Sequence, residues 1–250
     1  MSSPTLHGII GYPITNPFEA TIATTPPQMR PYLPSEDDIN QSDYTLTMRP
    51  DREFTLPANF WAVKKLTYRM AKQDHPAPLM FLIAGTGAPY DSSLNEFLKK
   101  LFYQAGYHVV QLSSPTSYDF MSAASRYATP GISQYDAEDL YRVMQAVRAQ
   151  QARVPVTDYY LAGYSLGALD AAFVSKLDET RRSFNFKKVL LLNPPVNLYT
   201  SITNLDKLVQ TEVKGRSWPA HKLCRSSTPG VATCRLRRIR SFPCLYAQNR

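Results

Sequence analysis

The pattern of hydrophobic and polar positions predicts alternating strands and helices through the middle of the chain. Continuous apolar runs are typical of strands buried on both faces of a sheet, whereas apolar residues three or four apart are typical of helices. The strand pattern occurs at 78–84, 107–112, 157–162 and 188–193. The helix pattern occurs at 94–102, 136–153 and 166–177. This alternation predicts right-handed βαβ units, and therefore an α/β protein with a mostly parallel sheet.

The segments that flank this core have a different texture. Nine of the 20 prolines lie within residues 1–57, and proline removes a backbone donor and fixes φ. We therefore expect residues 1–77 to form an extended arm with one or two strands, at 45–49 and 66–70. Residues 113–131 show no regular period, so we expect an irregular connection there. The predicted organisation is the arm, a core at 78–212 and a tail at 213–250.

The tail holds the excess charge and the cysteines. The formal net charge of the chain is +8, but residues 1–214 carry equal numbers of acidic and basic side chains. Nine residues separate each of Cys224, Cys234 and Cys244 from the next, unlike the C-x2-C pairs of zinc sites. We expect a disordered tail without a metal site. The basic cluster at 235–240 is the one place where nucleic acid or an anionic membrane could bind. Because the rest of the chain is neutral, we expect no nucleic-acid partner.

The strongest chemical signal is the G-x-S-x-G pattern from Gly163 to Gly167, between an expected strand and an expected helix. In that setting the chain turns sharply, the glycines avoid collisions with neighbouring backbone, and the hydroxyl of Ser165 lies above the sheet. The amide of Leu166, at the helix N-terminus, can then donate to an oxyanion. The alternative is a tight turn whose serine only caps the helix.

A second signal, Gly85-Thr86-Gly87, follows the first buried strand. A dinucleotide-binding fingerprint would need a glycine at position 90, where Tyr90 stands, so that interpretation fails. Two interpretations remain. The segment is a plain tight turn, or it is a loop whose Thr86 or Gly87 amide supplies a second oxyanion donor. The nucleophile pattern elsewhere in the chain favours the second.

The segment from 78 to 197 resembles the serine α/β-hydrolases, the esterase and lipase superfamily. FLIAGTGAPYDS, YHVVQLSSPT, YLAGYSLGALDAAF and KVLLLNPPVNLY together resemble a group of poorly characterised bacterial members. The resemblance implies a doubly wound, mostly parallel sheet. It also implies Ser165 as the nucleophile for a small-molecule ester or other acyl substrate, oxyanion donors near Gly87 and Leu166, and no metal or organic cofactor.

Parts of that family's pattern are not recognisable in this sequence. The strand pattern stops at 193, so the last two strands of a full hydrolase sheet are not apparent. In that fold an acid and then a histidine follow the nucleophile in chain order. The only histidine after Ser165 is His221, in the tail, and Asp206 or Glu212 could orient it. Two further acids, Asp170 and Asp178, are expected on the surface of the helix after the serine.

Three functional hypotheses stay open. The first is a serine hydrolase. The second is a hydrolase-like chain, truncated or frame-shifted near residue 213, without activity. The third is a hydrolase-like scaffold with a binding tail. An aromatic entrance to the site is suggested by Tyr90, Tyr118, Phe120 and Tyr164.

The sequence says less about the cellular compartment and the oligomeric state. No apolar stretch is long enough for a transmembrane helix, and no signal peptide is visible. The sequence as given therefore predicts the cytoplasm, or the cell envelope if its N-terminus is incomplete. The oligomeric state stays open.

Overall fold

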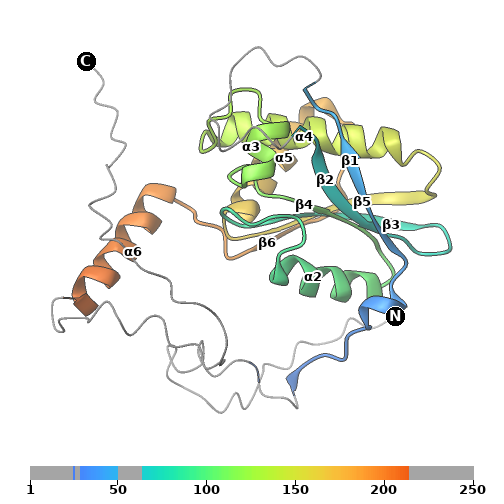
Figure 1. The fold of residues 1–250 in the computed structure, drawn as a ribbon, viewed down its shortest axis with the longest axis horizontal. Helices are drawn as coiled ribbons and strands as arrows, with labels where there is room; N and C mark the ends of the chain where they lie inside the picture. Colours follow the sequence, from blue (N-terminus) through green and yellow to red (C-terminus); the bar gives the residue numbers. More distant parts are fainter. Residues whose placement is uncertain (1–24, 26–28, 50–63, 214–250) are drawn as a thin grey trace, which may run out of the picture. The chain divides into compact units, whose positions relative to one another are not determined.

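Six strands form one mixed sheet in the part of the chain that the computed structural model describes, residues 25, 29–49 and 64–213. They are β1 (Gln41–Leu46), β2 (Leu66–Ala71), β3 (Ala77–Ile83), β4 (His108–Leu112), β5 (Val156–Tyr164) and β6 (Val189–Leu192). Their order is β1-β2-β4-β3-β5-β6. The β1–β2 and β2–β4 pairs are antiparallel, and the other pairs are parallel. The predicted mostly parallel sheet is confirmed (Figure 1).

Helices cover both faces of this sheet. They are α2 (Ser93–Gln104), α3 (Tyr118–Ala123), α4 (Ser133–Gln150) and α5 (Leu166–Arg181), with a short 3-10 helix, η2 (Glu36–Asp38), near the start of the described chain. A further helix, α6 (Leu198–Val213), follows the last strand along the chain. In Figure 1, α2 lies on one side of the sheet and the pair α4 and α5 lies on the other. The helices α2, α4 and α5 and the central strands agree with the sequence-based prediction, whereas α6 was not predicted.

The strand β3 separates two hydrophobic cores. Its residues Leu79, Phe81 and Ile83 belong to the core under α4 and α5. The alternate residues Met80 and Leu82 belong to the core under α2. Successive side chains of a strand point to opposite faces, so a strand between two helix layers is apolar at every position. This is the physical origin of the continuous apolar run at 78–84.

Two expected elements differ from the structure. The first strand was placed at 45–49, but β1 covers Gln41–Leu46. It is an edge strand in which only Leu46 is buried, and such a strand lacks a strong hydrophobic pattern. The connection at 113–131 contains α3, which has a single capped turn in which Ser117 Oγ accepts from the Phe120 amide. A helix of six residues is too short to show a period.

The chain divides into two compact units, Met1–Leu198 and Tyr199–Arg250. The strands β1 and β2, which fall in the predicted arm, belong to the sheet of the first unit. The tail at 214–250, with the three cysteines and the basic cluster, lies outside the described residues. No helix within the described ranges has the length and hydrophobicity needed to cross a membrane.

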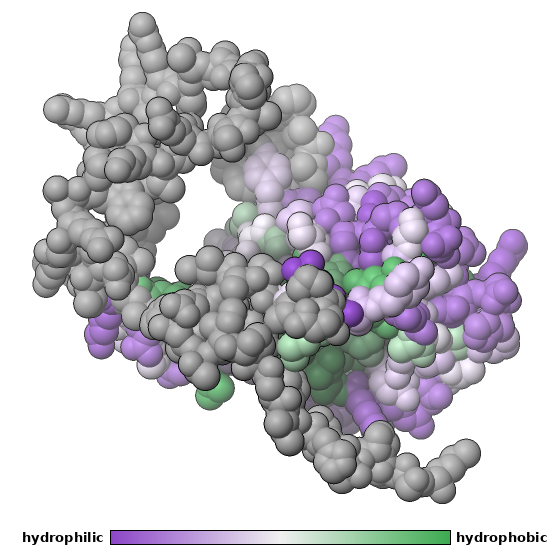
Figure 2. All heavy atoms as spheres, turned by 90° about the horizontal axis from the view of Figure 1, so that it is seen from below, coloured by the Kyte–Doolittle hydropathy of each residue, from purple (hydrophilic) through white to green (hydrophobic). Residues whose placement is uncertain are grey.

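The surface on the α2 side is mixed in character. Figure 2 views the molecule from below Figure 1 and shows hydrophilic residues over much of the surface, with hydrophobic residues gathered between them. The side chains of Leu94 and Phe97 on α2 are 44% and 40% exposed. At the far edge of the described sheet, Leu190 and Leu191 of β6 are 42% and 39% exposed.

Candidate active site

Ser165 lies at the sharp turn between β5 and α5, at the carboxyl end of the sheet. Its φ of 54° and ψ of −125° lie outside the regions that a residue with a side chain normally adopts, which stores strain at this position. The Ser165 side chain is exposed, whereas Leu166 beside it is buried. The Ser165 amide donates to the Leu192 carbonyl over 2.9 Å, so the turn is held by the end of β6.

The hydroxyl of Ser165 does not cap the helix. Ser165 occupies the N-cap position of α5, but its side chain accepts no hydrogen bond from the first turn. No partner for this hydroxyl occurs among the described residues. The helix-capping alternative is therefore wrong in this structure, and the hydroxyl is free to face a ligand.

Close backbone contacts bring the two sequence motifs together. A Cβ atom on Gly85 would lie 3.2 Å from Cβ of Ser165 and 2.7 Å from Cε2 of Tyr164. A Cβ atom on Gly167 would lie 2.3 Å from the carbonyl oxygen of Ala84. These approaches are too close for most side chains, which is the physical reason for glycine at both positions. The loop after β3 and the turn that carries Ser165 are direct neighbours.

The backbone amides of this region differ in their partners. The Gly87 amide donates to Oγ1 of Thr116 over 2.8 Å. In contrast, the amides of Thr86 and Leu166 have no hydrogen-bond partner within the described part of the chain. Leu166 is the first residue of α5, and the amides of a first helical turn have no partner within the helix. The structure therefore leaves Thr86 and Leu166 available to an anion, while Gly87 is already bonded.

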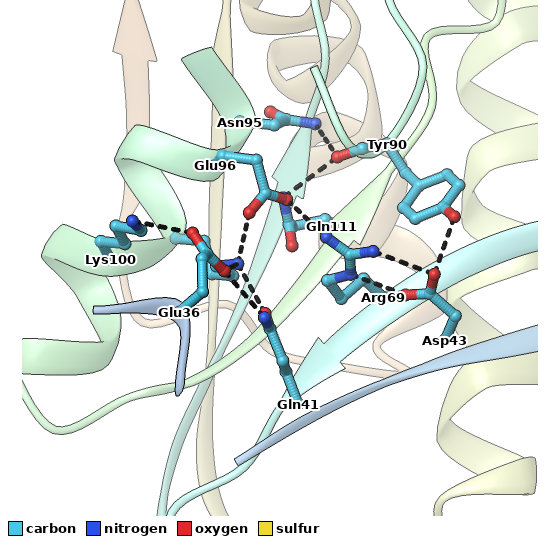
Figure 3. Close-up of polar contacts among 10 residues, drawn as sticks. Glu36, Gln41, Asp43, Arg69, Tyr90, Asn95, Glu96, Lys100 and Gln111 are labelled. Carbon is cyan, nitrogen blue, oxygen red and sulfur yellow. Dashed lines mark hydrogen bonds and ion pairs between the residues drawn. The ribbon is translucent and has the colours of Figure 1, made fainter. Parts of the chain in front are cut away.

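The loop between β3 and α2, residues 84–92, is held in place at Tyr90 (Figure 3). The Tyr90 carbonyl accepts from Nδ2 of Asn95 over 3.0 Å and from Nε2 of Gln111 over 3.1 Å. The Tyr90 hydroxyl donates to Asp43 over 3.0 Å. Burial, and then the neighbouring Asp43, raise the pKa of Tyr90 to about 12. The Tyr90 hydroxyl therefore keeps its proton at neutral pH, and its hydrogen bond to Asp43 continues to hold the loop.

Charged side chains extend this support between β1, β2 and α2 (Figure 3). Arg69 contacts Asp43 over 2.6 Å and Glu96 over 3.1 Å. The ammonium group of Lys99 is completely buried and donates to Glu36, Gln41 and Glu96. Because three acceptors surround it, this buried charge is compensated.

The Glu36 carboxylate of this cluster is strongly held in its charged form. Burial acts to raise its pKa, but hydrogen bonds from Lys100, Lys99 and Gln41 together outweigh burial and lower the pKa to about 2. The Glu36 carboxylate is thus charged at neutral pH.

Neither described histidine lies at the carboxyl ends of the parallel strands, where Ser165 is. His108 and Tyr159 both pair with Leu79, so His108 lies level with a residue six positions before Ser165 in a parallel arrangement. The imidazole of His108 is buried between the Gln73 amide and the Pro155 carbonyl, and burial lowers its pKa. His75 lies in the exposed turn before β3, and therefore also at the amino end of a parallel strand. His221 lies outside the described residues.

The acids that follow Ser165 are placed differently from the expectation. Asp170 and Asp178 were expected on the surface, but they are only 1% and 4% exposed because α4 covers this face of α5. Asp178 accepts from the Tyr141 hydroxyl over 2.6 Å and from the Phe184 amide over 3.0 Å, so it holds the turn that follows α5. Neither carboxylate is free to orient a base.

Asp170 is the less satisfied of the two buried acids. Its Oδ2 atom has no hydrogen-bond partner among the described residues. Burial, and then the nearby Asp136, raise its pKa to about 8. Asp206 lies on α6 with an exposed side chain, and the side chain of Glu212 is not described.

The expected aromatic entrance is only partly present. Phe120 is completely buried and belongs to the core under α4 and α5, so its assignment to an entrance is wrong. Tyr164 packs against Gly85, and its hydroxyl lies 3.0 Å from Ser92 Oγ. Tyr118 is 41% exposed. Sequence reasoning could not separate these roles, since all four residues are aromatic and lie near chain turns.

Among the described residues, no three His, Cys, Asp or Glu side chains gather closely enough to hold a metal ion. The sequence matches no protein-family model, and no curated protein matches it significantly. Solved structures do match. An esterase of Pyrococcus furiosus is similar with a TM-score of 0.51 and 14% identity, over 69% of this chain and 56% of that chain.

Two further esterases show weaker similarity. A hyperthermophilic esterase from the archaeon Pyrobaculum calidifontis has a TM-score of 0.47 and 18% identity, over 66% of this chain and 48% of that one. The bacterial brefeldin A esterase, a homologue of human hormone-sensitive lipase, has a TM-score of 0.46 and 16% identity, over 69% and 46%. This chain thus spans about half the length of these structures. The similarity to the Pyrococcus furiosus esterase, whose TM-score is above 0.5, confirms the predicted fold class: an α/β fold of the α/β-hydrolase type.

Proposed function

We propose that this chain cleaves carboxylic esters or other acyl compounds with Ser165 as the nucleophile. The observation that carries the proposal is the exposed hydroxyl of Ser165 in a strained turn near the amides of Thr86 and Leu166, three groups that have no hydrogen-bond partner in the described part of the chain. A strained strand-to-helix turn is the setting in which such a serine acts. The similarity in fold to esterases agrees with this chemistry.

The proposed reaction has two stages. Ser165 Oγ attacks the carbonyl carbon of the substrate, the bond to the leaving alcohol breaks, and an acyl group stays on the serine until water removes it. The negative oxygen of each tetrahedral intermediate accepts from the Leu166 amide, aided by the positive end of the α5 dipole. A second amide of the 84–92 loop donates to the same oxygen. Loss of one such donor typically costs about 100-fold to 1000-fold in rate.

A general base must take the proton from Ser165, and we propose that it comes from outside the described residues. The described histidines lie at the amino ends of the parallel strands, away from Ser165. Of the described acids after Ser165, Asp170 and Asp178 are buried, Glu179 pairs with Lys176 near the end of α5, and the others lie on α6. His221 follows Ser165 in the chain order of the fold. Asp206 is the acid that the sequence offers as the partner of that histidine.

Labelling with a fluorophosphonate tests this proposal. We expect the full chain to incorporate the probe at Ser165, as located by mass spectrometry, and to release p-nitrophenol from short acyl esters. The variant Ser165→Ala should lose both properties. Ser42→Ala, which alters an exposed serine on β1, is the matched control and should react as the wild type does. Wild-type labelling no higher than that of Ser165→Ala would contradict the proposal and favour a hydrolase-like chain without activity.

A further inference from the structure

A serine-rich segment, residues 113–117, runs along the 84–92 loop and bonds to it in three places. The Gly87 amide donates to Thr116 Oγ1 over 2.8 Å, and the Tyr90 amide donates to Ser113 Oγ over 2.9 Å. Between these contacts, the Ser114 amide donates to the Ala88 carbonyl over 3.0 Å. The segment therefore contacts the loop at both sides of its turn, and the same loop approaches the candidate nucleophile at Gly85.

The serine-rich segment is itself rigidly held. Ser113 Oγ donates to Asp119 over 2.6 Å, and Ser117 Oγ donates to the other oxygen of the same carboxylate over 2.5 Å. The side chains of Ser113, Ser114 and Ser117 are at most 2% exposed. Hydroxyl groups that are buried and bonded in this way have little freedom to rotate. The oxygen atoms of this segment that accept from the loop amides, Ser113 Oγ and Thr116 Oγ1, are therefore fixed in position.

The orientation of the Thr116 hydroxyl follows from these contacts. Its oxygen accepts from the Gly87 amide, and it also lies 2.8 Å from Ser114 Oγ. The Gly87 amide is consequently occupied, and Gly87 has a positive φ of 67°, a left-handed conformation that reverses the chain just after Thr86. The Thr86 amide, one residue earlier, has no partner among the described residues.

We propose that Thr116 is a positioning residue for the reaction, a role that rests on the proposed function. By accepting the hydrogen bond of Gly87, Thr116 fixes the turn so that the Thr86 amide points to the anion site opposite Leu166. In this assignment Thr86 and Leu166 are the oxyanion donors, and Gly87 is not. The opposite assignment makes Gly87 the donor and Thr116 an obstacle that must leave when substrate binds.

The two assignments predict effects of opposite sign for Thr116→Val, which keeps the shape of the side chain and removes the acceptor. If Thr116 positions the loop, this variant should lower kcat and the rate of fluorophosphonate labelling at least about tenfold, because transition-state contacts depend on position within fractions of an ångström. KM should change less than about twofold. Thr116→Ser should restore the rate. Thr129→Val, at an exposed threonine, is the matched control.

Amide hydrogen exchange supplies a readout that does not depend on activity. We expect the Gly87 amide to exchange at least about tenfold faster in Thr116→Val than in the wild type or Thr116→Ser. Equal exchange in all three, or faster labelling of Thr116→Val, would overturn the proposal. A wild-type chain that protects Gly87 but is never labelled would instead contradict the proposed function, and with it any role of Thr116 in a reaction.

Discussion

A Cβ atom on Gly163 would lie 2.1 Å from the carbonyl oxygen of Gly167. Gly163 belongs to the end of β5 and Gly167 to the first turn of α5, so the two glycines face each other across the turn that carries Ser165. The absence of a side chain at Gly163 is what allows the strand and the helix to meet within so few residues. The pattern recognised in the sequence thus has a direct steric cause.

The first prediction follows from this contact. Gly163→Ala should lower the free energy of unfolding by about 3 kcal/mol or more, because a backbone carbonyl cannot move aside as a flexible side chain can. Gly106→Ala is the control, since a Cβ atom there meets nothing within 4 Å and only the positive φ of 87° is unfavourable. That control should cost about 1 kcal/mol. Urea unfolding measures both, and equal losses would contradict the steric argument.

The second prediction concerns the buried carboxyl of Asp170. Its pKa is about 8 in the folded chain, compared with 3.8 for an ordinary aspartate, so the folded state binds more protons than the unfolded state between these two values. The contribution of the Asp170 carboxyl to stability should therefore be complete below about pH 4 and should be lost as the pH rises towards 8, by at most about 1.4 kcal/mol per pH unit. Urea unfolding at pH 5, 6, 7 and 8 measures this slope.

Asp170→Asn isolates the contribution of this one group. The amide cannot ionise, so the stability of the variant relative to the wild type should increase steadily from pH 5 to pH 8. Groups that titrate in both proteins cancel in this difference. Asp158→Asn is the control, because the Asp158 side chain is 40% exposed and its ion pair with Lys187 is long, at 3.5 Å. A difference between Asp170→Asn and wild type that does not vary with pH would refute the assignment.

The central part of the fold could be predicted because its sequence signature is local. Strand β3 lies between two helix layers, so burial on both faces produces one continuous apolar run. Strand β1 lies at the edge with a single buried residue, and its position depends on pairing with β2 rather than on its own residues. Helix α3 depends on the Ser117 cap and on packing of Phe120, neither of which produces a period.

In the candidate site, too, some features could be predicted from the sequence and others could not. Ser165 could be identified because the turn demands glycines at fixed offsets. The hydrogen bond between Gly87 and Thr116 joins residues 29 positions apart, so no short-range sequence pattern could predict it. The burial of Asp170 was missed because α5 is rich in alanine, and small apolar residues on several faces do not reveal which face another helix covers.

The third prediction concerns the buried ammonium group of Lys99. Lys99→Met should destabilise the chain by about 3 kcal/mol, because it removes a buried charged partner of the Glu96 carboxylate. The contacts of Glu96 with Arg69 and Gln111 stay in place. Lys100→Met is the matched control on the same helix. Its ion pair with Glu36 is 2.8 Å long and more exposed, so its loss should cost less than about 1 kcal/mol. Equal effects in thermal or urea unfolding would show that burial of Lys99 adds nothing.

The fourth prediction locates the general base. His108 is buried at the amino end of β4 and bonded on both nitrogens, so it cannot receive a proton from Ser165. We therefore expect His108→Gln to change the labelling rate of folded protein by less than about threefold. If His221 is the base, His221→Gln should lower that rate by about 100-fold or more, the usual contribution of general-base catalysis.

The pH dependence separates a base from a merely structural histidine. Labelling through a neutral imidazole should increase as the pH passes through about 6.5, the ordinary pKa of histidine, and then level off. The residual rate of His221→Gln should lack this step, while His108→Gln should keep it. A wild-type step that survives in His221→Gln would rule out His221. Labelling of His221→Gln at the full wild-type rate would have the same consequence, since a serine without its base loses most of its reactivity.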